Sequence, residues 1–235
     1  MIRVENLTVS YGAIRALDDV SVQANPGRVT AILGANGAGK STLLRTISGL
    51  VAPKSGRVFF GDRSILSTST ENIARLGVAH VPEGRGVIYE LTVEENLRLG
   101  AFASKVDIRE GLEKQYTQFP VLGERRKKYC ATLSGGERQM LAMARALISN
   151  PRVLLLDEPS LGLAPQVTSE LMNLILELCH ASDLTVMLVE QNAKSALRIA
   201  HDAVVLHLGV VVASGEADVI AKDKNLRHYY LGLVQ

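Results

Sequence analysis

Gly34-Ala35-Asn36-Gly37-Ala38-Gly39-Lys40-Ser41 matches the phosphate-loop pattern G-x-x-x-x-G-K-[ST] at every fixed position. The three glycines allow backbone N–H groups to turn inward on a tight curve, as the binding of several phosphate oxygens requires. The pattern predicts that Lys40 reaches the β- and γ-phosphates and that the Ser41 hydroxyl binds Mg²⁺. Thr42 continues into an expected helix, whose N-terminus directs its positive dipole end at the phosphates. This stretch therefore predicts a site for a nucleoside triphosphate with magnesium.

The sequence before the loop agrees with that prediction. Residues 28–33 form a short apolar run that enters the loop in the way a buried parallel strand does. The alternative interpretation is a glycine-rich turn without a ligand, and the strand context disfavours it.

Composition limits the architecture and the partners. A chain of 235 residues with 47% hydrophobic content is long enough for one substantial α/β core with an inserted lobe. The 26 basic and 24 acidic residues nearly balance, which gives no reason to expect a nucleic-acid partner. Cys130 and Cys179 form neither a metal-binding spacing nor a disulfide framework, as fits a reducing cytosol. No apolar run approaches the ~18 residues of a membrane helix, so we expect any membrane role to depend on partner proteins.

Three later apolar runs each have the length of a buried strand and end in polar residues. They are residues 76–81 before Pro82-Glu83, residues 153–156 before Asp157-Glu158, and residues 185–189 before Glu190-Gln191. Ligands of open parallel sheets bind beyond the carboxyl ends of the strands. The sequence therefore predicts a parallel sheet with these polar residues at its binding edge.

The remaining patterns predict two further kinds of structure. Residues 2–33 alternate in short runs, which indicates antiparallel strands before the phosphate loop, and residues 58–62 indicate another strand. Residues 84–148 have helical spacing, so we expect a helical lobe inserted into the α/β core. Residues 203–208 and 210–213, separated by Gly209, predict a hairpin.

A second motif, L-S-G-G-E-R-Q at residues 133–139, opens one of the expected helices. Ser134 with Glu137 three residues later is a capping box, and a well-capped helix is the simplest interpretation. The two adjacent glycines, Gly135 and Gly136, also allow a phosphate to approach the helix N-terminus closely.

Together the two motifs resemble the ATP-binding cassette (ABC) ATPases, and L-S-G-G-E-R-Q resembles their signature sequence. The resemblance covers nearly the whole chain. It implies a P-loop α/β fold with a RecA-like core, an N-terminal antiparallel β subdomain and an inserted helical subdomain. The implied boundaries place residues 1–83 and 149–235 in the core with the antiparallel subdomain, and residues 84–148 in the helical subdomain.

The resemblance also implies residue roles. Residues 153–158 resemble the Walker B strand and its catalytic glutamate, and residues 160–164 resemble the loop that crosses the dimer interface. Tyr11 stands where the family has an aromatic residue that stacks on adenine, although a turn tyrosine on the surface is the alternative. Within the family, residues 81–85, 91–97, 157–165 and 189–193 resemble the smaller ATPase subunit of branched-chain amino-acid importers. The urea and short-chain amide importers are near relatives.

Two positions depart from the wider family in the same way as that importer group. Glu83 replaces the usual glutamine of the loop that links the γ-phosphate and Mg²⁺ to the helical lobe, and a carboxylate can still bind Mg²⁺ or its water. Gln191 replaces the usual switch histidine, and a glutamine can donate a hydrogen bond but cannot take up a proton as histidine can.

The implied mechanism uses ATP and Mg²⁺. Ser41, Glu83 and Asp157 would organise Mg²⁺, Glu158 would be the general base for the attacking water, and Gln191 would sense the γ-phosphate. The residues expected to contact ATP are Tyr11, Gly34, Ala35, Asn36, Gly37, Ala38, Gly39, Lys40, Ser41, Thr42 and, acting on ATP held by a second subunit, Ser134, Gly135 and Gly136.

The implied partners are a second ABC ATPase subunit in a homo- or heterodimer, two membrane permease subunits and, indirectly, a solute-binding protein. The implied location is the cytoplasmic face of the cell membrane. Two rival interpretations remain. In one, Gln191 leaves this chain binding ATP while a partner hydrolyses it. In the other, the chain is a DNA-repair or chromosome ATPase, although it carries no visible coiled coil or zinc insertion.

Overall fold

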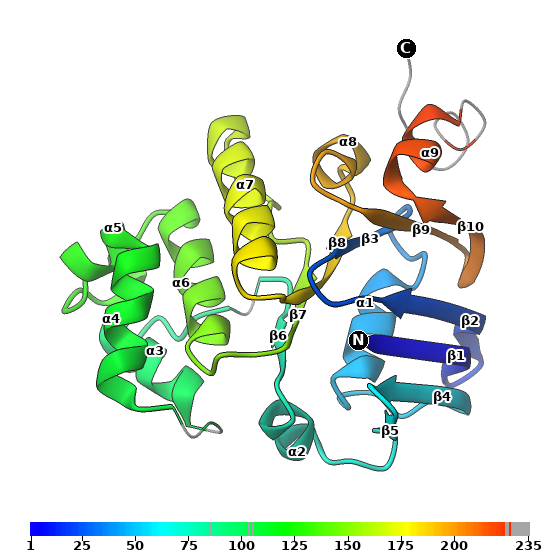
Figure 1. The fold of residues 1–235 in the computed structure, drawn as a ribbon, viewed down its shortest axis with the longest axis horizontal. Helices are drawn as coiled ribbons and strands as arrows, with labels where there is room; N and C mark the ends of the chain where they lie inside the picture. Colours follow the sequence, from blue (N-terminus) through cyan, green and yellow to red (C-terminus); the bar gives the residue numbers. More distant parts are fainter. Residues whose placement is uncertain (85, 103, 105, 224–225, 227–235) are drawn as a thin grey trace.

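The computed structural model describes residues 1–84, 86–102, 104, 106–223 and 226, and it contains two β-sheets (Figure 1). Arg85, which belongs to one of the motifs quoted above, lies outside the described residues. The central sheet has the strand order β10 (Val210–Glu216), β9 (Asp202–His207), β3 (Val29–Leu33), β8 (Thr185–Glu190), β7 (Val153–Asp157), β6 (Val78–Val81). All its neighbouring strands are parallel except β10, which is antiparallel to β9. The parallel strands and the β9–β10 hairpin confirm the sequence predictions.

The register of the parallel strands aligns their carboxyl ends. Leu33 of β3 pairs with Glu190 of β8, and Asp157 of β7 pairs with Val189. In the outermost strand, β6, Val81 pairs with Leu156 of β7. The polar residues that follow these strands therefore meet at one edge of the sheet, next to the loop that follows β3.

Central strands are apolar along their length because both faces of the sheet are covered. Alternate side chains such as Ile32, Leu155 and Met187 pack in one buried cluster with α1 (Lys40–Ile47) and the antiparallel sheet. Their neighbours along the strands, such as Leu154 and Leu188, pack in the other cluster with α7 (Pro165–Ala181) and α8 (Ala193–Leu197). This two-sided burial explains the continuous hydrophobic runs.

A second, antiparallel sheet forms from the N-terminal strands. Its order is β2 (Ile14–Ala24), β1 (Ile2–Tyr11), β4 (Ser55–Phe60), β5 (Arg63–Ser64). In β1 every second residue is buried over much of its length, as one-sided packing requires. These strands confirm the predicted antiparallel region.

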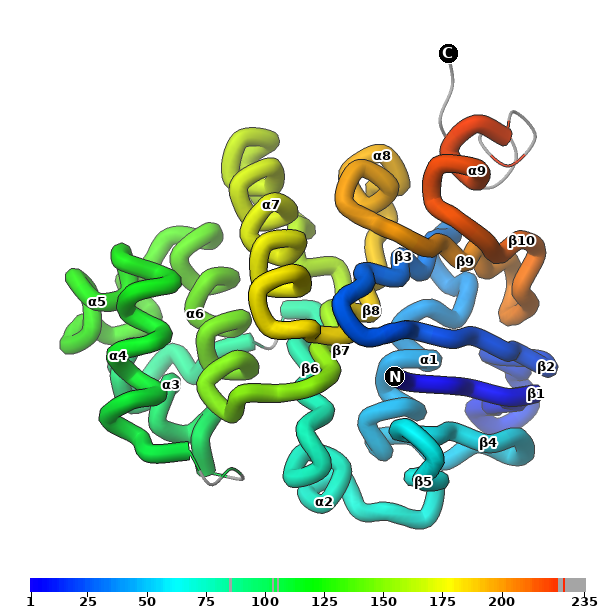
Figure 2. Tube along the Cα trace, in the orientation of Figure 1, coloured from blue at the N-terminus to red at the C-terminus, as the bar shows by residue number. Residues whose placement is uncertain are grey.

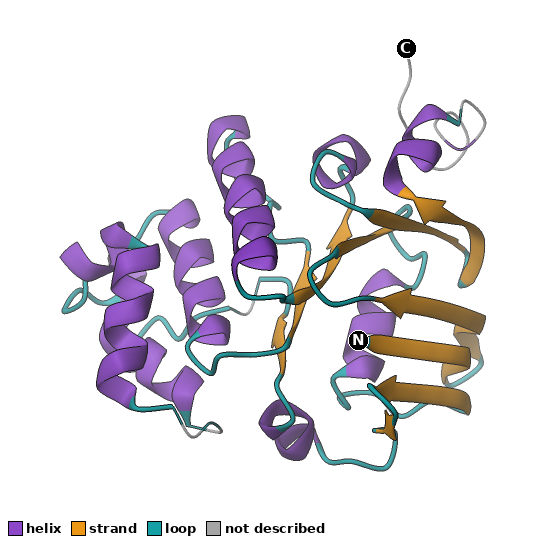
Figure 3. Cartoon of the chain, in the orientation of Figure 1, coloured by secondary structure: helices purple, strands orange, loops and turns teal. Residues whose placement is uncertain are grey.

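The helical segment comes between β6 and β7 in the sequence and lies to one side of both sheets in the tube and cartoon views (Figures 2 and 3), where its buried residues share a hydrophobic cluster with the central sheet. Its elements are α3 (Val93–Ala101), α4 (Ile108–Gln118), α5 (Pro120–Glu124), the 3₁₀ helix η1 (Cys130–Thr132) and α6 (Gly135–Leu147). Two short helices outside this segment are α2 (Thr70–Arg75), before β6, and α9 (Ala217–Lys222), after β10. The domain boundaries at residues 83/84 and 148/149 stay predictions.

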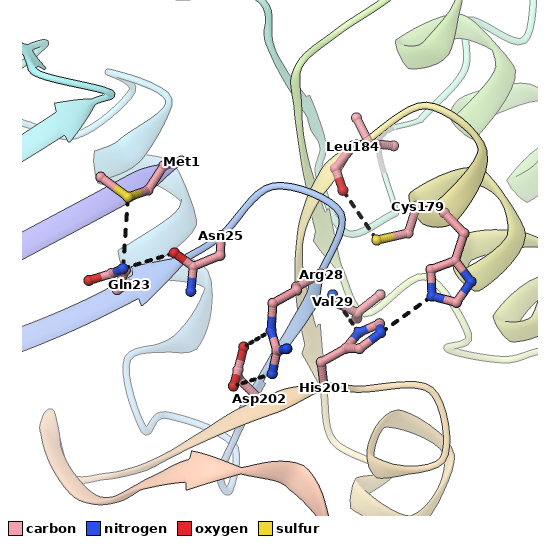
Figure 4. A network of polar contacts seen from close by, with 10 residues as sticks. Met1, Gln23, Asn25, Arg28, Val29, Cys179, Leu184, His201 and Asp202 are labelled. Atoms are coloured by element: carbon pink, nitrogen blue, oxygen red, sulfur yellow. Dashed lines mark hydrogen bonds and ion pairs between the residues drawn. The ribbon is translucent and has the colours of Figure 1, made fainter.

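A polar network fixes the amino ends of β3 and β9, away from the carboxyl edge (Figure 4). The Arg28 guanidinium donates two hydrogen bonds, of 2.8 and 2.9 Å, to the Asp202 carboxylate. Beside this pair, the Val29 N–H donates to His201 Nδ1 at 3.0 Å. The network holds β3 in register, and β3 leads directly into the phosphate loop.

Candidate functional site

The loop between β3 and α1 has a backbone that only glycine accommodates at two positions. Gly34 has φ +150°, and a Cβ there would overlap the carbonyl oxygen of Leu206. Gly39 has φ +102°, and its Cβ would lie 2.5 Å from the carbonyl oxygen of Ala16. A side chain at either position would therefore strain the backbone and collide with a neighbouring strand.

The N-terminus of α1 has no side-chain cap. Its N-cap residue is Gly39, and its first turn contains no acidic residue. The first N–H groups of a helix have no partner within the helix, and they carry its partial positive charge. The start of α1 thus has both the donors and the charge that phosphate oxygens require.

Lys40 is held by groups of the site itself. Its side chain is only 4% exposed, and Nζ donates to the carbonyl oxygens of Gly34 at 2.9 Å and Ala35 at 3.2 Å. Glu158 Oε1 lies 3.4 Å from the same ammonium group. The lysine thus already points back over the loop, where it would meet a bound phosphate.

Ser41 and Asp157 form the second polar pair of the site. The Ser41 hydroxyl donates to Asp157 Oδ1 at 2.9 Å, and Asp157 is 1% exposed. Asp157 Oδ2 is buried and has no hydrogen-bond partner among the described residues. Burial raises the pKa of Asp157, the Ser41 hydrogen bond opposes this, and the charges of Glu83 and Glu158 raise it further. An unpartnered carboxylate oxygen next to a hydroxyl and other carboxylates fits a divalent cation that prefers oxygen ligands, as Mg²⁺ does.

Glu158 has an unusual backbone conformation. Its φ is +48°, in the left-handed region that few non-glycine residues adopt. The Glu158 N–H donates to the carbonyl oxygen of Val189 at 2.9 Å, which ties this turn to β8. The strained turn brings the carboxylate to Lys40 instead of continuing the strand.

These groups surround a hollow of about 360 Å³ at the carboxyl edge of the sheet. Its described lining residues are Ala16, Asn36, Gly37, Ala38, Gly39, Lys40, Ser41, Thr42, Glu83, Glu158, Leu161 and Gln191. The structure therefore brings together most of the predicted phosphate-binding and catalytic residues. Gly34, Ala35 and Asp157 support this lining through their contacts with Lys40 and Ser41.

Tyr11 and the signature residues are not among the described lining residues of that hollow. Tyr11 lies at the end of β1 and is 47% exposed, so its role with adenine stays a prediction. Ser134, Gly135 and Gly136 lie at the start of α6, in the helical segment. Any contact between the signature residues and ATP therefore requires a different chain or a large movement of the helical segment.

The start of α6 has a side-chain cap that satisfies two of its backbone N–H groups. The Ser134 N–H donates to Glu137 Oε2 at 2.7 Å, and the Glu137 N–H donates to the Ser134 hydroxyl oxygen at 3.2 Å. The capping box predicted from the sequence is thus confirmed. The Ser134 hydroxyl hydrogen can still donate to an outside acceptor.

Two lining residues were missed or underrated by the sequence analysis. Ala16 comes from β2, and only the packing of the antiparallel sheet against α1 brings it to the phosphate loop. Leu161 was assigned to the loop of the dimer interface, yet it also lines the nucleotide hollow while 57% exposed. No local pattern marks either residue for this place.

The comparisons with known proteins agree with this geometry. The sequence pattern described as "ABC transporter" matches residues 17–161 of the chain. The chain is 43% identical to the high-affinity branched-chain amino acid transport ATP-binding protein BraG of Pseudomonas aeruginosa, over 99% of this chain and 100% of BraG. It is 38% identical to the probable branched-chain amino acid transport ATP-binding protein LivF of Archaeoglobus fulgidus, over 100% of both chains.

A solved structure extends the similarity to three dimensions. It is a dimeric ATP-binding cassette in a post-hydrolysis state with ADP and phosphate bound. It superposes with a TM-score of 0.84, at 26% identity, over 92% of this chain and 99% of that chain. The family match and this structure confirm the cassette fold, nucleotide binding and ATP hydrolysis that the sequence predicted.

Proposed function

The chain belongs to the ABC transporter family, and we propose that it is the ATP-hydrolysing subunit of an importer for branched-chain or other small amino acids. The observation that carries the proposal is the gathering of Lys40, Glu158 and Gln191 around the phosphate loop. The similarity to BraG and LivF, which are named for branched-chain amino acid transport, favours branched-chain amino acids over urea and short-chain amides.

In this proposal, ATP replaces the contacts that Lys40 makes within the site. The start of α1 and the loop N–H groups bind the β- and γ-phosphates, and Lys40 turns from Gly34, Ala35 and Glu158 to the γ-phosphate. Loss of the Lys40 contact leaves Glu158 as a carboxylate that can accept a proton from the attacking water. Binding of ATP thus frees Glu158 to act as the general base.

Ser41, Asp157 and Glu83 would hold Mg²⁺, directly or through water. Bound there, the ion would neutralise charge that develops on the phosphate oxygens during transfer. The unpartnered Oδ2 of Asp157 is the observation that supports this assignment. Gln191 lines the same hollow and would donate a hydrogen bond to the γ-phosphate.

We propose that two chains work face to face. Ser134 and Gly135 are exposed and lie outside their own chain's nucleotide hollow, so they can cover the γ-phosphate held by a second subunit. The dimeric cassette described above supports this arrangement. The second subunit is a copy of this chain or a different ABC ATPase.

We propose further that each of two permease subunits contacts one ATPase subunit, at a groove between the helical segment and the core. A hollow of about 340 Å³ lies there, lined by residues of α2, β6 and α6. Arg145 lines this groove without an ion pair to any described residue, and burial lowers its pKa. An acidic side chain of a permease would supply the missing partner.

The proposed location is the cytoplasmic face of the membrane, reached through the permeases and indirectly a solute-binding protein. Among the described residues, no helix is both long and apolar enough to cross a bilayer.

Transport by the assembled complex tests the proposal. The chain is purified with its attached permeases, reconstituted in vesicles and supplied with the solute-binding protein. Leucine should stimulate both ATP turnover and uptake. Stimulation by urea or acetamide instead of leucine would show that the transporter imports urea or short-chain amides. A wild-type chain without ATP turnover would favour the nucleotide-gated alternative.

A further inference from the structure

Glu190 is a buried carboxylate that the mechanism above does not use. It is the last residue of β8 and is only 2% exposed. Its Oε1 accepts a hydrogen bond from the Ser160 N–H at 3.0 Å. A buried carboxylate costs free energy unless hydrogen bonds compensate for its lost hydration, so the groups that bind it define what it does.

Those groups belong to two different loops. Ser160 lies two residues after Glu158, in the loop between β7 and α7, and Asn192 follows Gln191. Burial raises the pKa of Glu190, whereas hydrogen bonds from Ser160 and from the Asn192 backbone oppose that shift. The carboxylate therefore stands between the loop of the proposed base and the loop of the proposed γ-phosphate sensor.

The outer side of the Ser160 loop faces a hollow of about 400 Å³, lined among others by Ser160, Leu161, Glu190 and Gln191. Within the loop, Leu161 N–H donates to the Glu158 carbonyl at 3.2 Å, which shapes the turn but does not attach it to the sheet. Attachment to β8 comes from the Glu158 N–H to Val189 bond and from the Glu190 carboxylate.

We propose that Glu190 is a positioning residue for ATP hydrolysis. By holding the Ser160 N–H, it keeps the loop after Glu158 in a fixed place relative to Gln191, so that both face the γ-phosphate in one arrangement. In this proposal Glu190 acts through the Ser160 N–H and not by contact with ATP. The inference rests on the proposed ATPase function.

Steady-state hydrolysis by the full chain tests the inference with Glu190→Ala and Glu190→Gln. Glutamine keeps a carbonyl oxygen that can accept from the Ser160 N–H, and alanine does not. We expect Glu190→Ala to lower kcat about 10- to 100-fold, as loss of one hydrogen bond to a charged group can, with little change in KM. Glu190→Gln should restore most of kcat. Thr185→Ala, at the other end of β8 and equally buried, is the matched control and should keep kcat.

Two outcomes of this assay would overturn the inference. One is a wild-type kcat in Glu190→Ala, which would leave the hydrogen bond without effect on the reaction. The other is an equal loss in Glu190→Gln and Glu190→Ala, which would assign the effect to the negative charge. If Glu190→Ala fails to fold, Glu190→Met fills a similar volume without an acceptor and replaces it.

Hydrogen exchange of the Ser160 backbone N–H gives a readout that is independent of hydrolysis. In the isolated chain it should be faster in Glu190→Ala than in wild type and slow again in Glu190→Gln. Unchanged exchange in Glu190→Ala would show that the hydrogen bond from the Ser160 N–H to Glu190 does not hold the loop. A wild-type chain that does not hydrolyse ATP would refute the proposed function, while the exchange measurement would still decide the role of the hydrogen bond.

Discussion

Two helices begin at glycine-containing motifs, and their N-termini are completed differently. The α1 helix starts after Gly39, with no side-chain cap and no acidic residue in its first turn. The α6 helix starts after Ser134, with a full capping box and Glu137 in its first turn. The first N-terminus leaves its donors for a ligand, whereas the second satisfies two of its first four donors, the Ser134 and Glu137 N–H groups, within the chain.

The difference separates two kinds of phosphate contact. At α1, the uncapped N–H groups, Lys40 and Ser41 converge on one hollow, so this end can bind a triphosphate without help. At α6, the Glu137 carboxylate already occupies the Ser134 N–H, whereas the Ser134 hydroxyl hydrogen and the N–H groups of Gly135 and Gly136 lie outside the capping box. We infer that α1 supplies binding and α6 supplies a later contact, made when two chains meet.

Of the changes that test this difference between α1 and α6, replacing Lys40 by alanine should have the largest effect on ATP binding. ATP at 100 times its Kd should stabilise the wild-type chain by about 2.7 kcal/mol, and Lys40→Ala should lose most of this stabilisation together with hydrolysis. Thermal melting with and without Mg-ATP measures the effect, and the exposed Lys54→Ala is the matched control. An equal rise in Tm in Lys40→Ala and wild type would remove the binding role from the α1 end.

Glu158→Gln should separate binding from cleavage at the α1 end. We expect hydrolysis to fall by roughly 10²–10⁴-fold, the usual share of a positioned general base, while the ATP-induced rise in Tm persists. With cleavage blocked, ATP should accumulate a closed dimer on size-exclusion chromatography. Normal turnover in this variant would show that the base lies elsewhere.

Much of the α1 end could be predicted from the sequence because its chemistry is local. The loop, its lysine and its serine lie within residues 34–41, and the strand ends at Asp157 and Gln191 carry their own patterns. The capping box of α6 is equally local. Each depends on neighbours along the chain that a sequence shows directly.

Other features depend on contacts between distant segments, which local patterns do not encode. The order β10-β9-β3-β8-β7-β6 places β3 between β9 and β8, far from it in sequence. The same packing creates the Lys40–Glu158 contact and brings Ala16 to Gly39. The 17-residue helix α7 was not predicted, although Pro165 at its first position is a common signal of a helix start.

Ser134→Arg should have a smaller effect than the Lys40 change on binding and a large one on turnover. ATP binding by the isolated chain should be nearly intact, because Ser134 lies outside its own nucleotide hollow. Dimer-dependent hydrolysis should fall about 10²-fold or more, comparable with the loss of one preorganised donor to the reacting phosphate. Titration of ATP binding and turnover against protein concentration measures both.

Thr92→Arg is the matched control for Ser134→Arg. Thr92 caps α3 with the same kind of capping box, formed with Glu95. It should therefore lose a similar cap without losing hydrolysis. If Ser134→Arg weakened ATP binding as severely as Lys40→Ala does, the two helix N-termini would belong to one site, and the face-to-face arrangement would be wrong.

The smallest expected effect concerns the stability of the capped N-terminus alone. Burial by itself would raise the pKa of Glu137, but hydrogen bonds from Ser134 and the Arg125 charge together hold it below the ordinary value of 4.5. Arg125 Nε lies 2.6 Å from Glu137 Oε1. Glu137→Ala should lower the free energy of unfolding at neutral pH by about 1 kcal/mol, the usual value of a helix cap.

A comparison of wild type with Glu137→Gln at several pH values separates the contribution of the Glu137 charge from that of its capping hydrogen bonds. A carboxylate whose pKa is lowered in the folded state contributes full stability above its unfolded pKa and loses it as the pH falls through the folded pKa. The difference between wild type and Glu137→Gln, which keeps a cap acceptor but no charge, should therefore shrink below pH 4.5. Urea unfolding at neutral and acid pH measures it. A difference that is constant with pH would show that the negative charge of Glu137 adds nothing to the stability of the α6 N-terminus.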